Sequence, residues 1–178
     1  MHPLFTLRDS DIFPGREVPT DIVWRDRRTV KVVIFNDSGE VALLGNTANE
    51  YLELPGGGVW DNETLTEGAV RECEEETGCI VEIIGELGCT DDYRSRDTRH
   101  NINFGFTAKV VSHEGKVDLT DDEKTAGKQL RWVATNEAVI ILQKQEELLR
   151  DNKVGFYNTA FNMIRDSHFL QKAAKNIY

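Results

Sequence analysis

The pattern of apolar and polar positions divides the chain into short apolar runs, which predict β-strands, and longer periodic segments, which predict helices. The clearest strand is 101–111, where apolar residues at even positions from Ile102 to Val110 alternate with other residues and predict one inward face. Residues 36–39, Asn-Asp-Ser-Gly, predict a turn before a returning strand. The predicted strands are 29–35, 40–44, 51–54, 80–85, 101–111 and 129–133.

Three segments are typical of helices. Thr64 followed by Glu67 forms a capping box, so a helix is expected to begin near Leu65. Gly78 suits the left-handed position just past the end of that helix. Its predicted buried stripe consists of Leu65, Ala69 and Cys73. The other two helices are predicted from Thr135 to about Leu149 and from Asn158 to about Lys175.

This order of elements predicts an α/β fold, in which a mixed sheet carries helices on its faces. A chain of 178 residues is most simply one domain. Residues 1–28 are polar and punctuated by proline, and we expect them to add a peripheral strand or to cover a sheet edge. Residues 156–178 are expected to contain a C-terminal helix.

Composition narrows the range of partners. The net charge of −10 argues against broad binding to nucleic acid or to anionic membranes. No apolar run approaches the roughly 20 residues of a membrane span, and no basic flank precedes an apolar run as in a secretory signal. The three cysteines, Cys73, Cys79 and Cys89, lack zinc spacing, and reduced thiols in a cytoplasm are the simplest expectation.

The acidic residues of the first helix suggest a metal site. Glu72, Glu75 and Glu76 lie along one face, where like charges repel by a few tenths of a kcal/mol per pair, roughly. A cation that bridges them would reverse this cost, and oxygen ligands suit Mg²⁺ or Mn²⁺. A Glu-rich helix is more often a solvated face. Here, however, the apolar strand before it ends in residues 54–58, Leu-Pro-Gly-Gly-Gly, whose backbone can approach a ligand closely.

The segment from Gly57 to Cys79, GGVWDNETLTEGAVRECEEETGC, resembles the signature of the Nudix hydrolases, which cleave a nucleoside diphosphate linked to another group. Cys73 and Cys79 depart from it, since the family usually has Leu, Ile or Val there, but a free cysteine behaves as a small buried hydrophobe. The matching positions are Gly57, Glu63, Arg71, Glu72, Glu75, Glu76 and Gly78.

The resemblance implies an α/β/α sandwich over about residues 29–150, together with roles for individual residues. Glu63 and Arg71 would orient the loop and the helix, and Glu75 or Glu72 would accept the proton of the attacking water. Another acidic residue often comes from outside the signature, and we expect Glu123 or Asp122 to take that role. The implied metal ligands are Gly56, through its carbonyl, Glu72, Glu75, Glu76 and Glu123.

The substrate contacts implied by the resemblance lie in the Gly57 backbone and in residues 93–96. Arg94 or Arg96 could clamp a phosphate. A base could stack on Tyr93, Phe104 or Trp24, although packing is the commoner role of such aromatics. Trp132 is expected in the core, and Asn158 or Asn162 could read a base edge or could simply be solvated.

The sequence lacks the marks of several Nudix subfamilies, and this narrows the range of expected substrates. Subfamilies that act on ADP-ribose tend to carry a proline about fifteen residues past the signature, where residues 93–95 are Tyr-Arg-Ser. The marks of the diadenosine polyphosphate, NADH and coenzyme A subfamilies are also not visible. Nucleoside triphosphates, including oxidised ones, therefore lead, while ADP-ribose and nucleotide sugars stay open. Two further alternatives are a non-catalytic nucleotide-sensing module and a homodimer that exchanges residues 1–28.

Overall fold

The computed structural model describes residues 2–45, 51–150 and 156–175. Seven strands of this part of the chain form one mixed sheet in the order β1-β5-β6-β2-β3-β4, with β7 paired to β3. The strands are β1 (Thr6–Arg8), β2 (Arg25–Phe35), β3 (Glu40–Gly45), β4 (Leu52–Glu53), β5 (Ile80–Arg94), β6 (Arg99–Ser112) and β7 (Gln129–Ala134). The α-helices are α1 (Asp9–Ile12), α2 (Leu65–Thr77), α3 (Asp121–Thr125), α4 (Thr135–Arg150) and α5 (Tyr157–Lys175).

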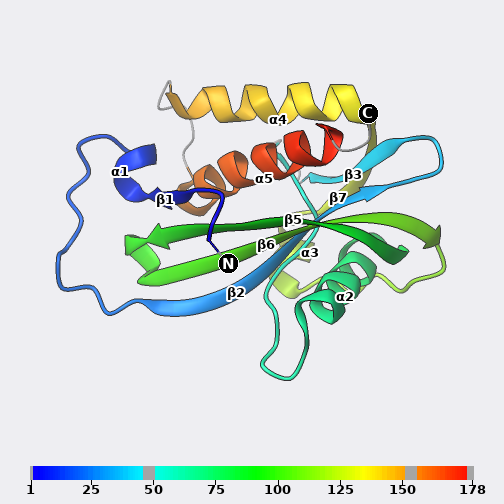
Figure 1. The fold of residues 1–178 in the computed structure, drawn as a ribbon, viewed down its shortest axis with the longest axis horizontal. Coiled ribbons are helices and arrows are strands. Elements are labelled where there is room, and N and C mark those ends of the chain that lie inside the picture. The colour runs from blue at the N-terminus through cyan, green and yellow to red at the C-terminus, as the bar shows by residue number, and fades with distance from the viewer. Residues whose placement is uncertain (1, 46–50, 151–155, 176–178) are drawn as a thin grey trace.

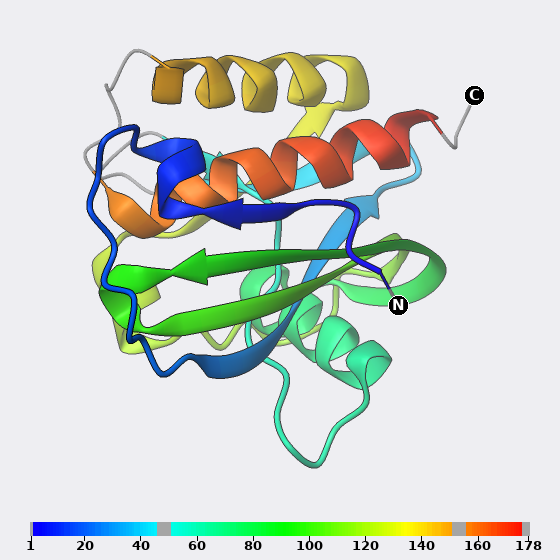
Figure 2. The same ribbon diagram turned by 60° about the vertical axis from the view of Figure 1, so that its left-hand side comes forward.

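The sheet lies between two layers of helices. Helices α4 and α5 cover one face of the sheet, and α2 and α3 lie on the other (Figure 1). The view in Figure 2 shows α5 extending along the sheet beside β1. The predicted α/β/α sandwich with a mixed sheet is therefore confirmed.

The predicted strands and helices are all present, but several boundaries were wrong. Strand β2 begins at Arg25, so residues 25–28 belong to the sheet and not to the peripheral segment. Strand β5 continues to Arg94, nine residues past the predicted end at Gly85 (94 − 85 = 9). Most residues of both extensions are polar, with Leu87 and Cys89 as buried apolar exceptions, so an apolar pattern does not mark their full length. Backbone pairing with β6 holds them instead.

The peripheral strand expected within residues 1–28 is β1, which pairs parallel with β5. Asp9 ties this segment to the rest of the structure, because its carboxylate accepts hydrogen bonds from Ser95 and from the hydroxyl of Tyr157. No helix in the described ranges combines the length and the apolar character that crossing a membrane requires.

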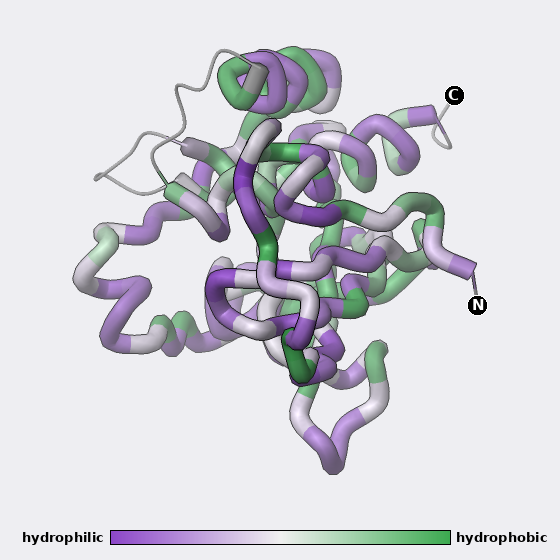
Figure 3. Tube along the Cα trace, turned by 90° about the vertical axis from the view of Figure 1, so that its left-hand side faces the viewer, coloured by the Kyte–Doolittle hydropathy of each residue, from purple (hydrophilic) through white to green (hydrophobic). Residues whose placement is uncertain are grey.

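Apolar side chains fill both faces of the central strands. One core lies under α4 and α5 and includes Val33, Leu142 and Phe169. The other lies under α2 and includes Val32 and the fully buried Cys73, which occupies the place of a small hydrophobe. Figure 3 shows the matching alternation of hydrophobic and hydrophilic residues along α4, the uppermost helix in that view. Burying each large side chain contributes about 1.5–3 kcal/mol, so the two cores hold the layers together.

Part of the sheet face under α5 is buried but polar. Side chains alternate along a strand, so residues two apart on β2, β6 and β5 line up across the sheet. In the observed register Thr29 lies opposite Asn103, which in turn lies opposite Thr90. We call this set the polar belt; its members are Thr29, Lys31, Thr90, Asp92, Arg94, Asn101 and Asn103.

The short strand β4 is held in place by side chains from α4 and α5. The amide of Gln145 accepts from the Leu52 backbone N–H and donates to the Leu52 carbonyl, both at 2.8 Å. Asp166 accepts from the Leu54 N–H at 3.0 Å. Because β4 leads directly into the glycine loop, these bonds also fix where that loop begins.

We predict that Gln145→Leu lowers the free energy of unfolding by about 2–4 kcal/mol, because it leaves a buried backbone donor and acceptor unpaired. Urea unfolding followed by circular dichroism measures the change. Gln143→Leu on the same helix is the control, since Gln143 is exposed and a change there should stay within about 0.5 kcal/mol. Equal effects of the two substitutions would contradict this role of Gln145.

Candidate active site

Helix α2 begins and ends where local signals place it. The capping box of Thr64 and Glu67 is formed, and Gly78 adopts the left-handed conformation with φ of 67°. These two caps fix where the helix begins and ends. Its apolar residues Ala69 and Cys73 pack against the sheet, and the glutamates lie beside the glycine loop.

Arg71 is the centre of the acidic cluster on α2. Its Nε and Nη2 atoms donate to the two carboxylate oxygens of Glu63 at 3.1 and 2.7 Å. Its Nη1 atom donates to Glu72 at 2.9 Å and to Glu75 at 2.8 Å. Glu63 also accepts from the Trp60 N–H at 2.8 Å. One guanidinium therefore joins the loop to the helix and holds three carboxylates near one another.

The glycine loop approaches this cluster through its backbone. The Gly56 N–H donates to Glu76 at 2.6 Å, and the Gly56 carbonyl accepts from the Lys31 ammonium at 2.7 Å. A Cβ atom at Gly56 would lie 2.2 Å from the Val30 carbonyl oxygen, and one at Gly57 would lie 2.6 Å from the Glu72 carboxylate. Only glycines leave room for this approach, which places Glu72 and Glu76 beside the 56–57 backbone.

Lys128 forms ion pairs with a second set of carboxylates. Its ammonium donates to Glu76 and to Glu123, the latter at 2.9 Å, and lies 3.5 Å from Glu53. Burial raises the pKa of Glu76 to about 7, although Lys128 acts in the opposite direction. For Glu123, burial alone would raise the pKa, but hydrogen bonds from Lys128 and from the Thr120 backbone outweigh it and lower the pKa to about 2.

The donor atoms of this region suit a hard divalent cation. Within the described ranges, no three Asp, Glu, His or Cys side chains already surround one point that would suit a metal ion. Arg71 holds Glu72 and Glu75, and Lys128 holds Glu76 and Glu123. All the donors are carboxylate or carbonyl oxygens, the ligands that Mg²⁺ and Mn²⁺ prefer, so the residues fit such an ion once it replaces the ammonium contacts.

Two adjoining cavities meet at these carboxylates. The outer cavity, of about 720 Å³, is lined by Trp60, Arg71, Glu72 and Glu75. The inner cavity, of about 280 Å³, lies over the polar belt and under α5. Both are also lined by Arg27, Gly57, Glu76 and Glu123. A phosphate chain at these shared residues could therefore reach into either cavity.

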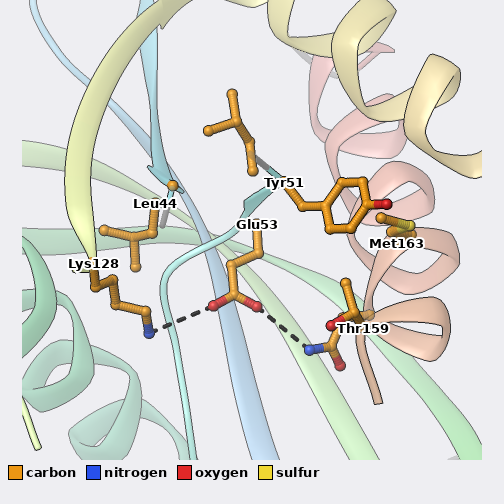
Figure 4. A pocket seen from close by; sticks show the side chains of 9 residues that line it. Leu44, Tyr51, Glu53, Lys128, Thr159 and Met163 are labelled. Carbon is orange, nitrogen blue, oxygen red and sulfur yellow. Dashed lines mark hydrogen bonds and ion pairs between the residues drawn. The ribbon is translucent and has the colours of Figure 1, made fainter. Parts of the chain in front are cut away.

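A smaller cavity of about 110 Å³ adjoins the inner cavity between β3, β4 and α5. Its apolar lining includes Leu44, Leu52 and Met163. In Figure 4, Glu53 lies between Lys128 on one side and Thr159 and Met163 of α5 on the other. Glu53 is bound there by Lys128 at 3.5 Å and by Asn162 at 3.4 Å. It lines both the smaller cavity and the inner cavity and lies between them.

The sequence-based assignments divide into two groups in space. The structure brings together one set around the two cavities: Gly56, Gly57, Glu63, Arg71, Glu72, Glu75, Glu76 and Glu123. Arg94 lines the inner cavity, but its guanidinium is already bound to Asp92, Asn158 and Asn162.

Asn158 and Asn162 line the inner cavity. Four other assignments, namely Trp24, Tyr93, Arg96 and Phe104, line neither the outer nor the inner cavity. Tyr93 stacks on His100 with a centroid distance of 4.2 Å, and Trp24 packs against the same ring. Phe104 packs in the core under α2. Arg96 lies beside Tyr157, where it lines a separate surface cavity with residues 156–159. These positions do not favour the expected base stacking or the phosphate clamp at Arg96.

Several residues of the site were missed by sequence reasoning. Two signals were available: Lys31 interrupts the apolar run TVKVVIF, and polar Asn101 and Asn103 alternate with apolar residues on β6. Buried polar positions inside such strands usually have a specific partner. The missed residues are Arg27, Lys31, Asn101, Asn103, Lys128 and Arg165.

Comparisons with known proteins agree with the geometry. A family model described as the NUDIX domain matches residues 25–154. A putative 8-oxo-dGTP diphosphatase of Bacillus subtilis is 29% identical over 125 residues, covering 70% of this chain and 78% of that protein. An ADP-ribose pyrophosphatase of Methanocaldococcus jannaschii is 34% identical over 97 residues, covering 52% of this chain and 56% of that protein.

Among solved structures, a NUDIX hydrolase from Nitrosomonas europaea superimposes with a TM-score of 0.55 at 20% identity. The match covers 81% of this chain and 89% of that chain. At this identity the likeness shows the fold alone.

We predict that the contact between Glu123 and Lys128 makes metal-free stability depend on pH. The folded pKa of Glu123 is about 2, below its ordinary 4.5, so its contribution is present above pH 4.5 and is lost as the pH falls toward 2. Wild type should therefore be more stable than Glu123→Gln at pH 7, and the difference should shrink progressively below pH 4.5. Urea unfolding in metal-free buffer measures it.

Glutamine at position 123 can still complete the capping box with Thr120, so the substitution isolates the charge. Asp122→Asn, which changes an exposed neighbour, is the matched control and should show no such trend. A difference between wild type and Glu123→Gln that stays constant from pH 7 to pH 3 would contradict this account.

Proposed function

The chain belongs to the Nudix family of pyrophosphohydrolases, and on this premise we propose that it hydrolyses a nucleoside diphosphate linked to another group with the help of a divalent metal ion. The observation that carries the proposal is the position of Glu72 and Glu76 beside the Gly56–Gly57 backbone. There Glu72 borders the outer cavity, and Glu76 borders both the outer cavity and the inner cavity, whose lining includes several cations.

Each residue around the cavities has a role in this proposal. Glu76 and Glu123, with the carbonyl of Gly56, would hold the metal together with whichever of Glu72 and Glu75 does not act as the base. A bound Mg²⁺ or Mn²⁺ would lower the pKa of the attacking water and neutralise charge on the phosphates. Arg71 keeps Glu63, Glu72 and Glu75 in position. Lys31 and Lys128 balance the buried negative charge and offer donors to phosphate oxygens.

The proton of the attacking water has two candidate acceptors. Glu72 and Glu75 both line the outer cavity, and both accept from the same Nη1 atom of Arg71. The carboxylate that does not hold the metal is free to take the proton. Glu76 is less suited to this role because its two oxygens are bound to Lys128 and to the Gly56 N–H.

We favour a nucleoside triphosphate, including an oxidised one, as the substrate, with a nucleoside monophosphate and pyrophosphate as products. The Bacillus subtilis relative supports this choice, because it is named for 8-oxo-dGTP and the match covers most of its length. ADP-ribose is the second candidate, supported by the 34% identity to the Methanocaldococcus jannaschii protein. Cys73, Cys79 and Cys89 are free thiols, which supports a cytoplasmic location.

We predict release of phosphate or pyrophosphate from a nucleotide panel in the presence of Mg²⁺ or Mn²⁺, and none with EDTA. Glu72→Gln and Glu75→Gln should each lower kcat by about 10²-fold or more, since each removes a metal ligand or the general base. Glu74→Gln is the matched control, because Glu74 contacts the Lys116 N–H away from both cavities.

The double variant Glu75→Gln, Glu76→Gln gives the decisive comparison. Full activity in it would refute the metal-site assignment. A wild type that binds nucleotides but hydrolyses none of them would refute hydrolysis and identify a nucleotide-sensing module instead.

A further inference from the structure

Two buried polar atoms in the inner cavity have no hydrogen-bond partner in the described part of the chain. They are Oδ1 of Asn101 and Nη2 of Arg165, whose residues are only 2% and 4% exposed. Both residues line the cavity. Buried polar atoms in native proteins nearly always have a partner. An unpaired acceptor and an unpaired donor at one cavity are therefore two positions where a bound ligand can supply the missing partners.

Asp92 fixes which atom of Asn101 is left free. Its carboxylate accepts from Nδ2 of Asn101 at 2.7 Å, from Nδ2 of Asn103 at 2.8 Å and from Nε of Arg94 at 2.6 Å. A carboxylate can only accept in these contacts, so the amide nitrogen of Asn101 must point to it. The amide oxygen of Asn101, a residue that lines the inner cavity, is then the acceptor left without a partner, and a donor such as a hydroxyl group would satisfy it.

Hydrogen bonds also fix the side chain of Arg165, which lies on α5. Its Nε donates to Asp166 at 2.8 Å, and its Nη1 donates to Asn103 at 3.3 Å. These two bonds set the plane of the guanidinium and leave Nη2 for a ligand. An anionic acceptor suits this position, because charge-assisted bonds to guanidinium are the stronger kind.

The inner cavity also carries unpaired positive charge. Arg27 and Arg99 line it, and their guanidinium groups make no hydrogen bond or ion pair with another described residue. Burial and then the charges of Arg99 and Arg94 lower the pKa of Arg27, and the charge of Glu72 acts in the opposite direction. An anion in the cavity would relieve this repulsion.

A nucleobase is a poor fit for the same space. No aromatic ring of the described residues lines the inner cavity, so it offers no stacking surface. An isolated phosphate would satisfy the arginines but would leave the Asn101 oxygen without a good donor. A phosphorylated sugar provides both the anion and the hydroxyl group.

We propose that the inner cavity binds the sugar–phosphate part of the substrate, with the phosphate against Arg27, Arg99 and Arg165 and a sugar hydroxyl donating to Asn101. The proposal rests on the proposed function in one respect, namely that the occupant belongs to the hydrolysed substrate. It places the base outside the inner cavity. Since Gly57, Glu76 and Arg27 border both cavities, the adjoining phosphate reaches the carboxylates directly.

The test is calorimetric titration of the whole protein with ribose 5-phosphate in buffer containing EDTA, so that no metal site is needed. We expect binding of ribose 5-phosphate, weaker binding of inorganic phosphate and none of ribose. Arg99→Gln and Arg27→Gln should each weaken ribose 5-phosphate binding about tenfold or more, the usual effect of losing a charged hydrogen bond. Neither arginine supports another described side chain, so both variants should fold, and their urea midpoints confirm it.

Arg25→Gln is the matched control. It removes the same charge from the same strand, but Arg25 donates to the Asp97 carbonyl and does not line the inner cavity. Binding of ribose 5-phosphate should be unchanged in this variant. An equal loss in Arg25→Gln would mean that long-range charge alone is responsible and would overturn the proposal.

Other results would overturn it in distinguishable ways. Unchanged affinity in both Arg99→Gln and Arg27→Gln would exclude the inner cavity as the site. Inorganic phosphate binding as tightly as ribose 5-phosphate would exclude the contact between the sugar and Asn101. Hydrolysis without ribose 5-phosphate binding refutes this inference and leaves the proposed function intact, whereas binding without hydrolysis refutes only the proposed function.

Discussion

The contact between Arg71 and the carboxylates of Glu63, Glu72 and Glu75 is the interaction on which the rest of the site depends. Arg71 is only 17% exposed, so its charge is largely removed from water and needs these partners. The carboxylates in turn would repel one another without it. Because Glu63 comes from the loop and the other two from α2, this one guanidinium sets the distance between loop and helix.

The part of the sheet face next to the site carries buried polar side chains in place of an apolar core. The polar belt is buried under α5, where each unpaired polar group would cost about 1–3 kcal/mol. Asp92 limits this cost, because it accepts hydrogen bonds from Asn101, Asn103 and Arg94 together. Among the buried side-chain atoms of the belt, Oδ1 of Asn101 is the one without a partner in the described part of the chain, and Asn101 lines the inner cavity. We infer that burial of polar groups here serves recognition and not stability alone.

Local signals account for what could be predicted. The ends of α2 agree with the sequence because a capping box and a left-handed glycine act within a few residues. The same signal is present for α3, where Thr120 and Glu123 form a capping box, yet no helix was predicted there. Strand β5 was cut short at Gly85 because most of its remaining residues are polar, and Leu87 and Cys89 alone do not form an apolar run. Pairing with β6 makes this segment a strand.

The sequence alone determined the family signature, the acidic face of α2, and the order of strands and helices, since these depend on neighbouring residues. Tertiary structure alone decided which charges meet. Lys128 contacts Glu76 from 52 positions away, and Arg165 contacts Asn103 from 62 positions away. In the folded chain Arg94 is paired with Asp92, whereas the guanidinium groups of Arg27 and Arg99 have no partner among the described residues. Spacing along the chain predicts partners within one helix, whereas strand register and the packing of α5 select partners across the sheet.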